Sequence, residues 1–441
     1  MERSPRNEKR RRDAKSDPTR GKRSKRVKEG PEGASTTPQI ETQASPNATE
    51  EVCRDALLVV GTYHSVMAGL VLKKGAFYIT FSVKHHVGCM NDVAVSAKYV
   101  ASCGVDERVF LFTNKLYARP GGGAEGGRAV RLAELGSVSP PAEVRCAAFT
   151  ADAHHLLCGC ADGQLLVYRT RDWGLRVRLP VHAKALQQLA LHPRSHGALC
   201  VTIGEDRSVA VLDLARHRLM TKWKYTSALG GKENEGEGEG ERPRERGRRP
   251  VWGIHQQEEP LSVCFSPSGG YWAVRSRFSV VVYHTTTMKA AFVVRLERPQ
   301  PEEELHSLVF ASEGVVVVGN EAGQLLYATL PAPQTEVSGA VAIALRPVEI
   351  RYEDEQQTRD AAALTKETNA RQKHPLRHTA RIKSLAREGR TLFSIDSAGV
   401  VIDWTMDFMQ TPEGEDSVAL SYVTSANCQG RVTAMGVLAL G

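Results

Sequence analysis

CGVDERVFLF, residues 103–112, returns along the chain as CGCADGQLLVY, residues 158–168, and as TIGEDRSVAVL, residues 202–212. Looser versions follow at residues 274–283, 319–328 and 395–404. In each version a short polar turn leads into alternating apolar residues that end near an aromatic side chain. This is the pattern of a β-strand that follows a tight turn. The repetition predicts an all-β array of similar sheets.

The spacing of these repeats is typical of propeller blades with insertions. The intervals between turn positions are 56, 44, 71, 45 and 76 residues, for Asp106, Asp162, Asp206, Arg277, Ala322 and Ala398. Two intervals match the ~40–45-residue period of a four-stranded blade. The others contain charged or flexible insertions near residues 118–128, 226–250 and 345–376. Residues 230–249 lack the apolar side chains that a core needs, and residues 353–373 predict a solvated helical excursion or disorder.

The number of blades reaches seven when the two ends of the array share one blade. Residues 57–72 resemble two later strands of a blade, and residues 419–440 resemble two earlier ones. Pairing them closes the ring and leaves no open edge between blades. We therefore predict a seven-bladed β-propeller over residues 52–441, preceded by a disordered basic tail over residues 1–51.

Positive charge is concentrated in that tail. Residues 1–30 contain 13 Lys or Arg and 5 Asp or Glu, so they carry a net charge equal to the +8 of the whole chain. Such clusters are solvated, and they indicate a nuclear import signal or an arm that binds RNA phosphates, with a solubilising tail as the alternative. The candidate residues are Lys9, Arg10, Arg11, Arg12, Lys22, Arg23, Lys25, Arg26 and Lys28. The basic stretch Arg242–Arg249 is a second candidate contact.

Several classes of function lack the residues that they need. The nine cysteines are odd in number and contain no Cys-x-x-Cys, which favours a reducing compartment and buried thiols over a shared metal. The glycine-rich loop at 118–128 precedes a strand-like stretch, whereas a phosphate cradle needs a helix start. No stretch is apolar enough to span a membrane. We predict no enzymatic activity, catalytic residue, cofactor, metal or small-molecule substrate.

Three histidines repeat at a fixed place in the array. His86, His182 and His378 each precede an expected strand and lie 20 to 24 residues before a turn position. The pattern resembles WD-repeat propellers, in which such a histidine joins a strand hydroxyl, a turn aspartate and a tryptophan in a buried hydrogen-bond chain. The resemblance implies structural blade residues at His86, Ser102, Asp106, Asp162, His182, Thr202, Asp206, His378 and Trp404.

The chain departs from that pattern in several blades. Ala322 and Ala398 stand where the aspartate is expected, Cys158 replaces the hydroxyl, and Leu212 replaces the tryptophan. A catalytic triad is the alternative interpretation of grouped His, Ser and Asp residues. A triad occurs once and needs an exposed nucleophile, whereas these groups recur with the repeat, so we interpret them as architecture.

A more specific resemblance lies in residues 171–214. This stretch is similar to the middle of the p21-activated-kinase-interacting protein family, also called the maintenance-of-killer type of WD-repeat ribosome assembly factor. The matching positions are Trp173, His182, Leu189, His192, Pro193, Gly204 and Asp206. The closing stretch resembles the end of that family through Asn427, Arg431, Thr433 and Gly436, and residues 61–72 resemble its opening strand. The similarity thus touches both ends and the middle of residues 57–441. Members of that family usually carry their basic tail after the propeller.

The resemblance implies a non-enzymatic scaffold in biogenesis of the large (60S) ribosomal subunit, located in the nucleus and nucleolus. The expected partners are pre-60S assembly factors and ribosomal proteins. The basic tail is expected near rRNA, and the protein is expected as a monomer within a larger complex without a membrane. Two alternatives remain: a signalling adaptor that binds and restrains a protein kinase, and a nuclear chromatin or ubiquitin-ligase adaptor.

Overall fold

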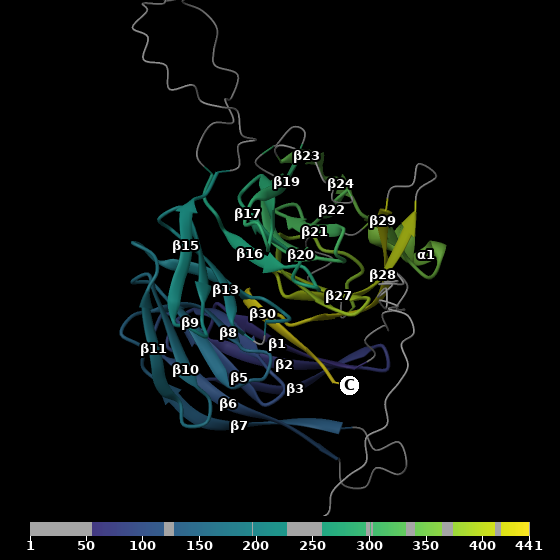
Figure 1. Ribbon diagram of the computed structural model, residues 1–441. Coiled ribbons are helices and arrows are strands. Elements are labelled where there is room, and N and C mark those ends of the chain that lie inside the picture. The colour runs from purple at the N-terminus through teal and green to yellow at the C-terminus, as the bar shows by residue number, and fades with distance from the viewer. Residues whose placement is uncertain are drawn as a thin grey trace, which may run out of the picture. The chain divides into compact units, whose positions relative to one another are not determined.

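Seven β-sheets, built from thirty strands among the described residues, are arranged as blades around a ring (Figure 1). All of the blades belong to one compact unit within residues 50–441. The computed structural model describes residues 55–118, 128–195, 197–226, 258–296, 300, 303–331, 340–363, 374–410 and 416–440.

Blades 2, 3 and 4 each consist of four consecutive antiparallel strands. The first strand of each blade is innermost, because it contacts the first strands of both neighbouring blades. The middle strands are apolar runs because sheet packing buries them on both faces. Blade 2 contains β4 (Met90–Val95), β5 (Tyr99–Gly104), β6 (Val109–Ala118) and β7 (Arg128–Val138). Blade 3 contains β8 (Val144–Phe149), β9 (His155–Cys160), β10 (Gln164–Arg169) and β11 (Gly174–Pro180). Blade 4 contains β12 (Leu186–Leu191), β13 (Leu199–Gly204), β14 (Ser208–Asp213) and β15 (Arg218–Lys224).

Blades 5, 6 and 7 follow the same order but receive additional strands at their outer edges. Blade 5 contains β16 (Ser262–Phe265), β17 (Tyr271–Arg275), β18 (Ser279–His284), β19 (Ala290–Arg295) and β23 (Val341–Ala344). Blade 6 contains β20 (Leu305–Phe310), β21 (Val315–Asn320), β22 (Leu325–Thr329) and β24 (Arg346–Pro347). Blade 7 contains β26 (Ile382–Glu388), β27 (Thr391–Asp396), β28 (Val400–Gln410), β29 (Asp416–Asn427) and β25 (Glu349–Arg351).

Blade 1 closes the ring with strands from both ends of the described chain. It contains β30 (Val432–Ala439), β1 (Ala56–Thr62), β2 (Val66–Lys73) and β3 (Ala76–Lys84). β1 pairs antiparallel with β30, from Ala56 opposite Ala439 to Thr62 opposite Val432. The division is three strands plus one, whereas the sequence suggested two plus two. The reason is that β29 pairs along its full length with β28 and so belongs to blade 7.

The turn positions of the six sequence repeats all fall between the second and third strands of blades 2 to 7. The face of the ring that carries these turns is called the turn face below. Since strands within a blade alternate in direction, the loops that connect one blade to the next reach the same face. The seven-bladed propeller predicted from the repeats is therefore the observed fold.

The hydrophobic core is divided among the interfaces between blades. Seven clusters of buried side chains are found among the described residues, one between each pair of neighbours. Blades 7 and 1, for example, meet through Leu58, Leu70, Phe393 and Val401, all at most 2% exposed. Burying one such side chain contributes about 1.5–3 kcal/mol. Each blade is therefore stabilised from both sides.

One stretch of chain, residues 340–351, crosses the outer edges of three blades and is called the rim segment below. Its strands are β23, parallel to β19 of blade 5, then β24, antiparallel to β22 of blade 6, then β25, parallel to β29 of blade 7. Leu345 and Val348, between these strands, are buried. In Figure 1, β23 lies beside β19, and α1 (Glu355–Ala363) lies beside the long β28–β29 hairpin.

The expected insertions fall largely outside the described residues, which leave out 119–127, 227–257 and 364–373. The described part of the third differs from a charged, flexible insertion. Residues 345–351 are integrated into the sheets because Leu345 and Val348 supply apolar anchors that the backbone pairing holds in place. The helix α1 then occupies part of the predicted helical stretch, and its Ala361 is buried.

Candidate functional site

Blade 2 contains the first of three buried histidine chains. His86 contacts Asp106 through Nδ1, at 2.9 Å from Oδ1, and Ser102 through Nε2, at 2.9 Å from Oγ. Asp106 also accepts a hydrogen bond of 3.0 Å from the backbone N–H of Val87. Burial raises the pKa of Asp106, but the hydrogen bonds from His86 and Val87 outweigh it and lower that pKa. The chain ties the turn of the blade to the loop that enters it.

Blade 4 repeats the arrangement with an added cation. His182 contacts Asp206 at 3.0 Å through Nδ1 and Thr202 at 2.9 Å through Nε2. Lys222, on the outer strand, donates to Asp206 Oδ2 at 2.8 Å, and Ser208 also donates to this carboxylate. Burial raises the pKa of Asp206, but Lys222 and Ser208 lower it well below the usual range. The pKa of His182 is lowered by its burial.

Blade 7 has the complete chain of four residues. His378 contacts Asp396 at 3.2 Å and Ser394 at 2.7 Å, and the indole N–H of Trp404 donates to Ser394 Oγ at 2.7 Å. From the WD-repeat pattern, we expected the aspartate of this blade at position 398, where the chain has an alanine. The structure supplies Asp396 instead, two positions earlier, at the end of β27. Its carboxylate also accepts hydrogen bonds from the backbone of Ala398 and Val400.

Asp162 has a different environment from the other two turn aspartates. Its side chain is exposed and accepts a hydrogen bond of 3.1 Å from the backbone N–H of Gln164. Cys158 occupies the position of the strand hydroxyl and is fully buried. Asp162 therefore stabilises its own turn rather than joining a histidine chain.

These histidines hold structure and are not available for proton transfer. Both ring nitrogens of His86, His182 and His378 have partners in the blade. All three side chains are buried. A general base needs a free nitrogen within reach of a substrate. The chains therefore fix the turn face as a rigid platform.

Polar side chains recur at the same place on the inner strands of six blades, next to that platform. At the second position of six inner strands, one extra residue interrupts the pairing with the next strand. Such β-bulges turn a side chain out of the regular sheet. The bulge residues are Asn91, Arg145, Gln187, His306, Lys383 and Thr433. The sequence marks these positions by an apolar residue followed by a polar one at the start of a strand, such as Ile382-Lys383, and this pattern could have predicted them.

Four cations lie at the ends of strands that point to the turn face: Arg381 and Arg431 come just before β26 and β30, Lys383 is the second residue of β26, and Arg275 ends β17. The pKa of Lys383 is lowered first by desolvation and then by the charges of Arg381, Arg275 and Arg431. These residues come from blades 5, 7 and 1, and they are called the basic mouth below. Arg431 is exposed, and its guanidinium lies 4.9 Å from the ring centre of Tyr63. Positive charges that share one face of the ring favour a negatively charged partner.

Neighbouring groups fix parts of the basic mouth. Arg275 is buried and donates to Ser262 Oγ at 3.0 Å and to the carbonyl of Ser276 at 3.3 Å. Burial lowers its pKa to about 10. Arg381 lies 3.8 Å from the carboxylate of Glu321. Arg275 and Arg381 are thus held in place, while Lys383 and Arg431 are the members best suited to contact a partner.

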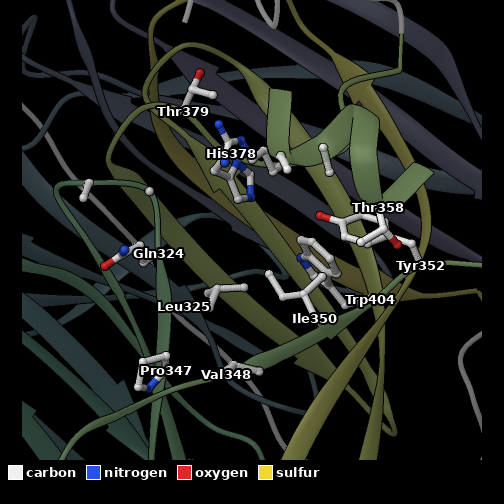
Figure 2. A pocket seen from close by; sticks show the side chains of 15 residues that line it. Gln324, Leu325, Pro347, Val348, Ile350, Tyr352, Thr358, His378, Thr379 and Trp404 are labelled. Atoms are coloured by element: carbon white, nitrogen blue, oxygen red, sulfur yellow. The ribbon is translucent and has the colours of Figure 1, made fainter. Parts of the chain in front are cut away.

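A second recess of about 590 Å³ lies between blades 6 and 7. Figure 2 shows Leu325 and Ile350 pointing toward each other beside Trp404, with Tyr352 and Thr358 close by. Tyr352 donates to the carbonyl of Leu376 at 3.2 Å. The lining of the recess combines apolar side chains with polar ones, among them Gln324 and Arg377.

The remaining predicted site residues lie outside the described residues. They are the tail residues Lys9, Arg10, Arg11, Arg12, Lys22, Arg23, Lys25, Arg26 and Lys28, together with the stretch 242–249. Within the described part of the chain, no group of three or more His, Cys, Asp or Glu residues is arranged to hold a metal ion. No helix there is long and apolar enough to cross a membrane. Cys103, Cys146, Cys158 and Cys200 are buried, and burial raises the pKa of each thiol.

The chain is similar to curated proteins from three vertebrates. It is 25% identical over 164 residues to the p21-activated protein kinase-interacting protein 1-like of Gallus gallus. Proteins of the same name from Xenopus laevis and Danio rerio match at 25% identity over 165 residues. Each match covers 36% of this chain and 40% or 41% of the relative, so the chain spans about 40% of the length of the relatives that it matches. No protein-family model matches the chain. These matches cover fewer residues than the range 57–441 over which the sequence motifs indicate similarity.

Proposed function

We propose that this protein is a non-enzymatic scaffold that docks assembly factors or ribosomal proteins on precursors of the large (60S) ribosomal subunit in the nucleolus. The observation that carries the proposal is the basic mouth on a closed, rigid propeller. A ring fixed by buried hydrogen-bond chains presents its surface loops without rearrangement, and binding function collects in such loops. The propeller and the names of the relatives support the coarser role of a protein-interaction scaffold.

The positive charge of the basic mouth and of residues 1–30 supports binding of this protein to a negatively charged particle. Lys383 and Arg431 come from adjacent blades on the turn face, and residues 1–30 carry a net charge of +8. Acidic protein segments and RNA phosphates both lower the repulsion between such cations. Precursor ribosomal particles contain both. The sequence resemblance over residues 171–214 and 425–440 favours this setting among anionic partners.

The test is purification of the tagged full chain from cells at moderate salt, followed by sequencing of the RNA and mass spectrometry of the proteins that accompany it. We expect precursors of large-subunit rRNA together with assembly factors. The double variant Lys383→Glu and Arg431→Glu should reduce their recovery about tenfold, which corresponds to about 1.4 kcal/mol. The control is Lys98→Glu, an exposed lysine in the turn between β4 and β5 on the opposite face. Recovery without rRNA, or equal loss in both variants, contradicts the proposal.

A signalling adaptor is the second candidate, because the relatives are named for an interaction with p21-activated protein kinase. It predicts that the same purification yields a protein kinase and no rRNA. The purified kinase would then bind the wild-type chain directly and lose activity on binding. A kinase recovered only together with rRNA and assembly factors would contradict the adaptor.

A further inference from the structure

The outer edges of the seven blades are protected in different ways. In blades 2, 3 and 4 the outer strands carry charged residues, which oppose pairing with another strand. These charges are Glu134 on β7, Arg176 and Arg178 on β11, and Arg218, Lys222 and Lys224 on β15. Blades 2 to 4 therefore resist edge-to-edge contacts through charge.

Blades 5, 6 and 7 are protected by covering strands. The rim segment adds β23 to β19, β24 to β22 and β25 to β29. The added strands on blades 5 and 7 are parallel to the edges that they cover, with Phe292 opposite Val341 and Ala419 opposite Glu349. The outer strands of this ring are thus able to accept one more parallel strand.

The outer strand of blade 1 has neither form of protection among the described residues. β3 is AFYITFSVK, with Lys84 at its end as its one charged residue. Its inner edge pairs with β2, and no described strand pairs with its outer edge. Tyr78 and Ile79 are 57% and 70% exposed. A strand with a single charge at its end, an outer edge that no described strand pairs, and exposed β-formers is a template for strand addition.

We propose that the outer edge of β3 binds an extended, uncharged segment of a partner protein as a fifth, parallel strand of blade 1. The ring itself shows the chemistry that fits, since β23 is the uncharged sequence Val341–Ala344. Main-chain hydrogen bonds supply affinity in this mode, and small or β-branched side chains at alternate positions supply specificity. Two copies of β3 related by a two-fold axis would pair antiparallel, whereas both five-stranded blades add their strand in parallel.

The first experiment measures binding of a fluorescein-labelled peptide, AVAIAL, which copies residues 340–345, to the full chain by fluorescence anisotropy. Ile79→Lys should weaken binding at least about tenfold, because it places a charge on the edge. Its matched control, Leu219→Lys on the charged strand β15, should bind like the wild type; Leu219 is 43% exposed. Failure of the wild type to bind, or equal binding by both variants, overturns the proposal.

Two further measurements test the geometry and the occupant. A peptide with proline in place of both Ala342 and Ile343 loses a backbone N–H on each edge, because successive N–H groups point to opposite edges, and should bind more weakly; equal binding overturns strand addition. A photo-crosslinker at the N-terminus of the peptide should label the Ala76 end of β3, and labelling at Lys84 overturns the parallel direction.

Light scattering tests the occupant and should show a monomer. A dimer that Ile79→Lys dissociates would mean that a second copy of this chain occupies the edge, and it overturns the proposal of a partner protein. Since Ile79 is exposed, the lysine should leave thermal stability unchanged; if it does not, Tyr78→Lys replaces it, because Tyr78 is also exposed.

Discussion

At the scale of single residues, the buried carboxyl groups of the ring fall into two classes that respond oppositely to pH. The folded chain lowers the pKa of Asp206, so its contribution to stability is present above the ordinary aspartate pKa of 3.8 and is lost as pH falls. Burial raises the pKa of Asp403 to about 7 and that of Asp92 to about 6. Their contribution is present below pH 3.8 and is lost as pH rises through those values.

Asp403 gives the clearest test of this division. Its side chain is 3% exposed, and its Oδ1 has no hydrogen-bond partner in the part of the chain that the structure describes. Asp403→Asn removes the cost of ionisation, so we expect the variant to become more stable relative to the wild type as pH rises from 4 to 7. The gain should level off above pH 7 at up to about 4 kcal/mol. Urea unfolding at a series of pH values measures it, with Asp162→Asn as an exposed control. A difference that does not change with pH would contradict the interpretation.

At the scale of elements, the turn between the second and third strands decides how well a blade is anchored. Asp206 joins His182, Lys222 and Ser208 across two strands and a loop, whereas Asp162 stabilises one turn. When a buried charged partner is removed, the groups that were hydrogen-bonded to it remain buried without a partner. The two aspartates occupy the same place in the repeat but contribute very different amounts to the free energy of unfolding.

Alanine substitutions separate these two turns. Asp206→Ala should cost about 2–4 kcal/mol, because His182 and Lys222 lose their anionic partner. Asp162→Ala should cost less than about 1 kcal/mol, the value of one exposed turn hydrogen bond. Chemical denaturation of both variants measures the difference. Equal costs, or an Asp206→Ala variant that keeps its stability and loses partner binding, would show that these aspartates serve recognition instead.

Sequence periodicity predicted the turns but not everything that surrounds them. The six turn positions could be found because a turn and its following strand are local in sequence. Asp396 was missed because the chain closes the third histidine network from two positions earlier, which fixed spacing does not detect. The rim segment was missed for another reason: its strands are two to four residues long, and each pairs with a different blade. Lys383 and Arg431 meet only when the ring closes, so no local pattern brings them together.

At the scale of the whole molecule, stability depends on closure between β1 and β30. Two of the seven core clusters, those on either side of blade 1, need this blade to be complete. Gly436 lies on β30, where an added Cβ would be 2.6 Å from Val95 Cγ2 of the neighbouring blade. A side chain at this position has to push blades 1 and 2 apart.

Gly436→Ala is therefore expected to cost about 1–3 kcal/mol, the range for overpacking a tight core. Gly430→Ala is the matched control, because its added Cβ would meet Thr62 at an ordinary 3.4 Å. Thermal unfolding measures the stability of both, and hydrogen exchange should show faster opening of β1 and β30 in the first variant. Unchanged exchange in these strands, with stability lost elsewhere, would contradict a closure defect.

The register of that closing pair has a mechanical consequence. Ala56 lies opposite Ala439, so the chain enters and leaves the ring at the same end of the β1–β30 pair. A pulling force applied through the two flanks therefore peels the strands apart one hydrogen bond at a time, instead of loading the whole pair in shear. Rupture then starts at a low force, set by a single bond at the tip. A ring that seven interfaces between blades stabilise is thus mechanically weakest at the β1–β30 pair.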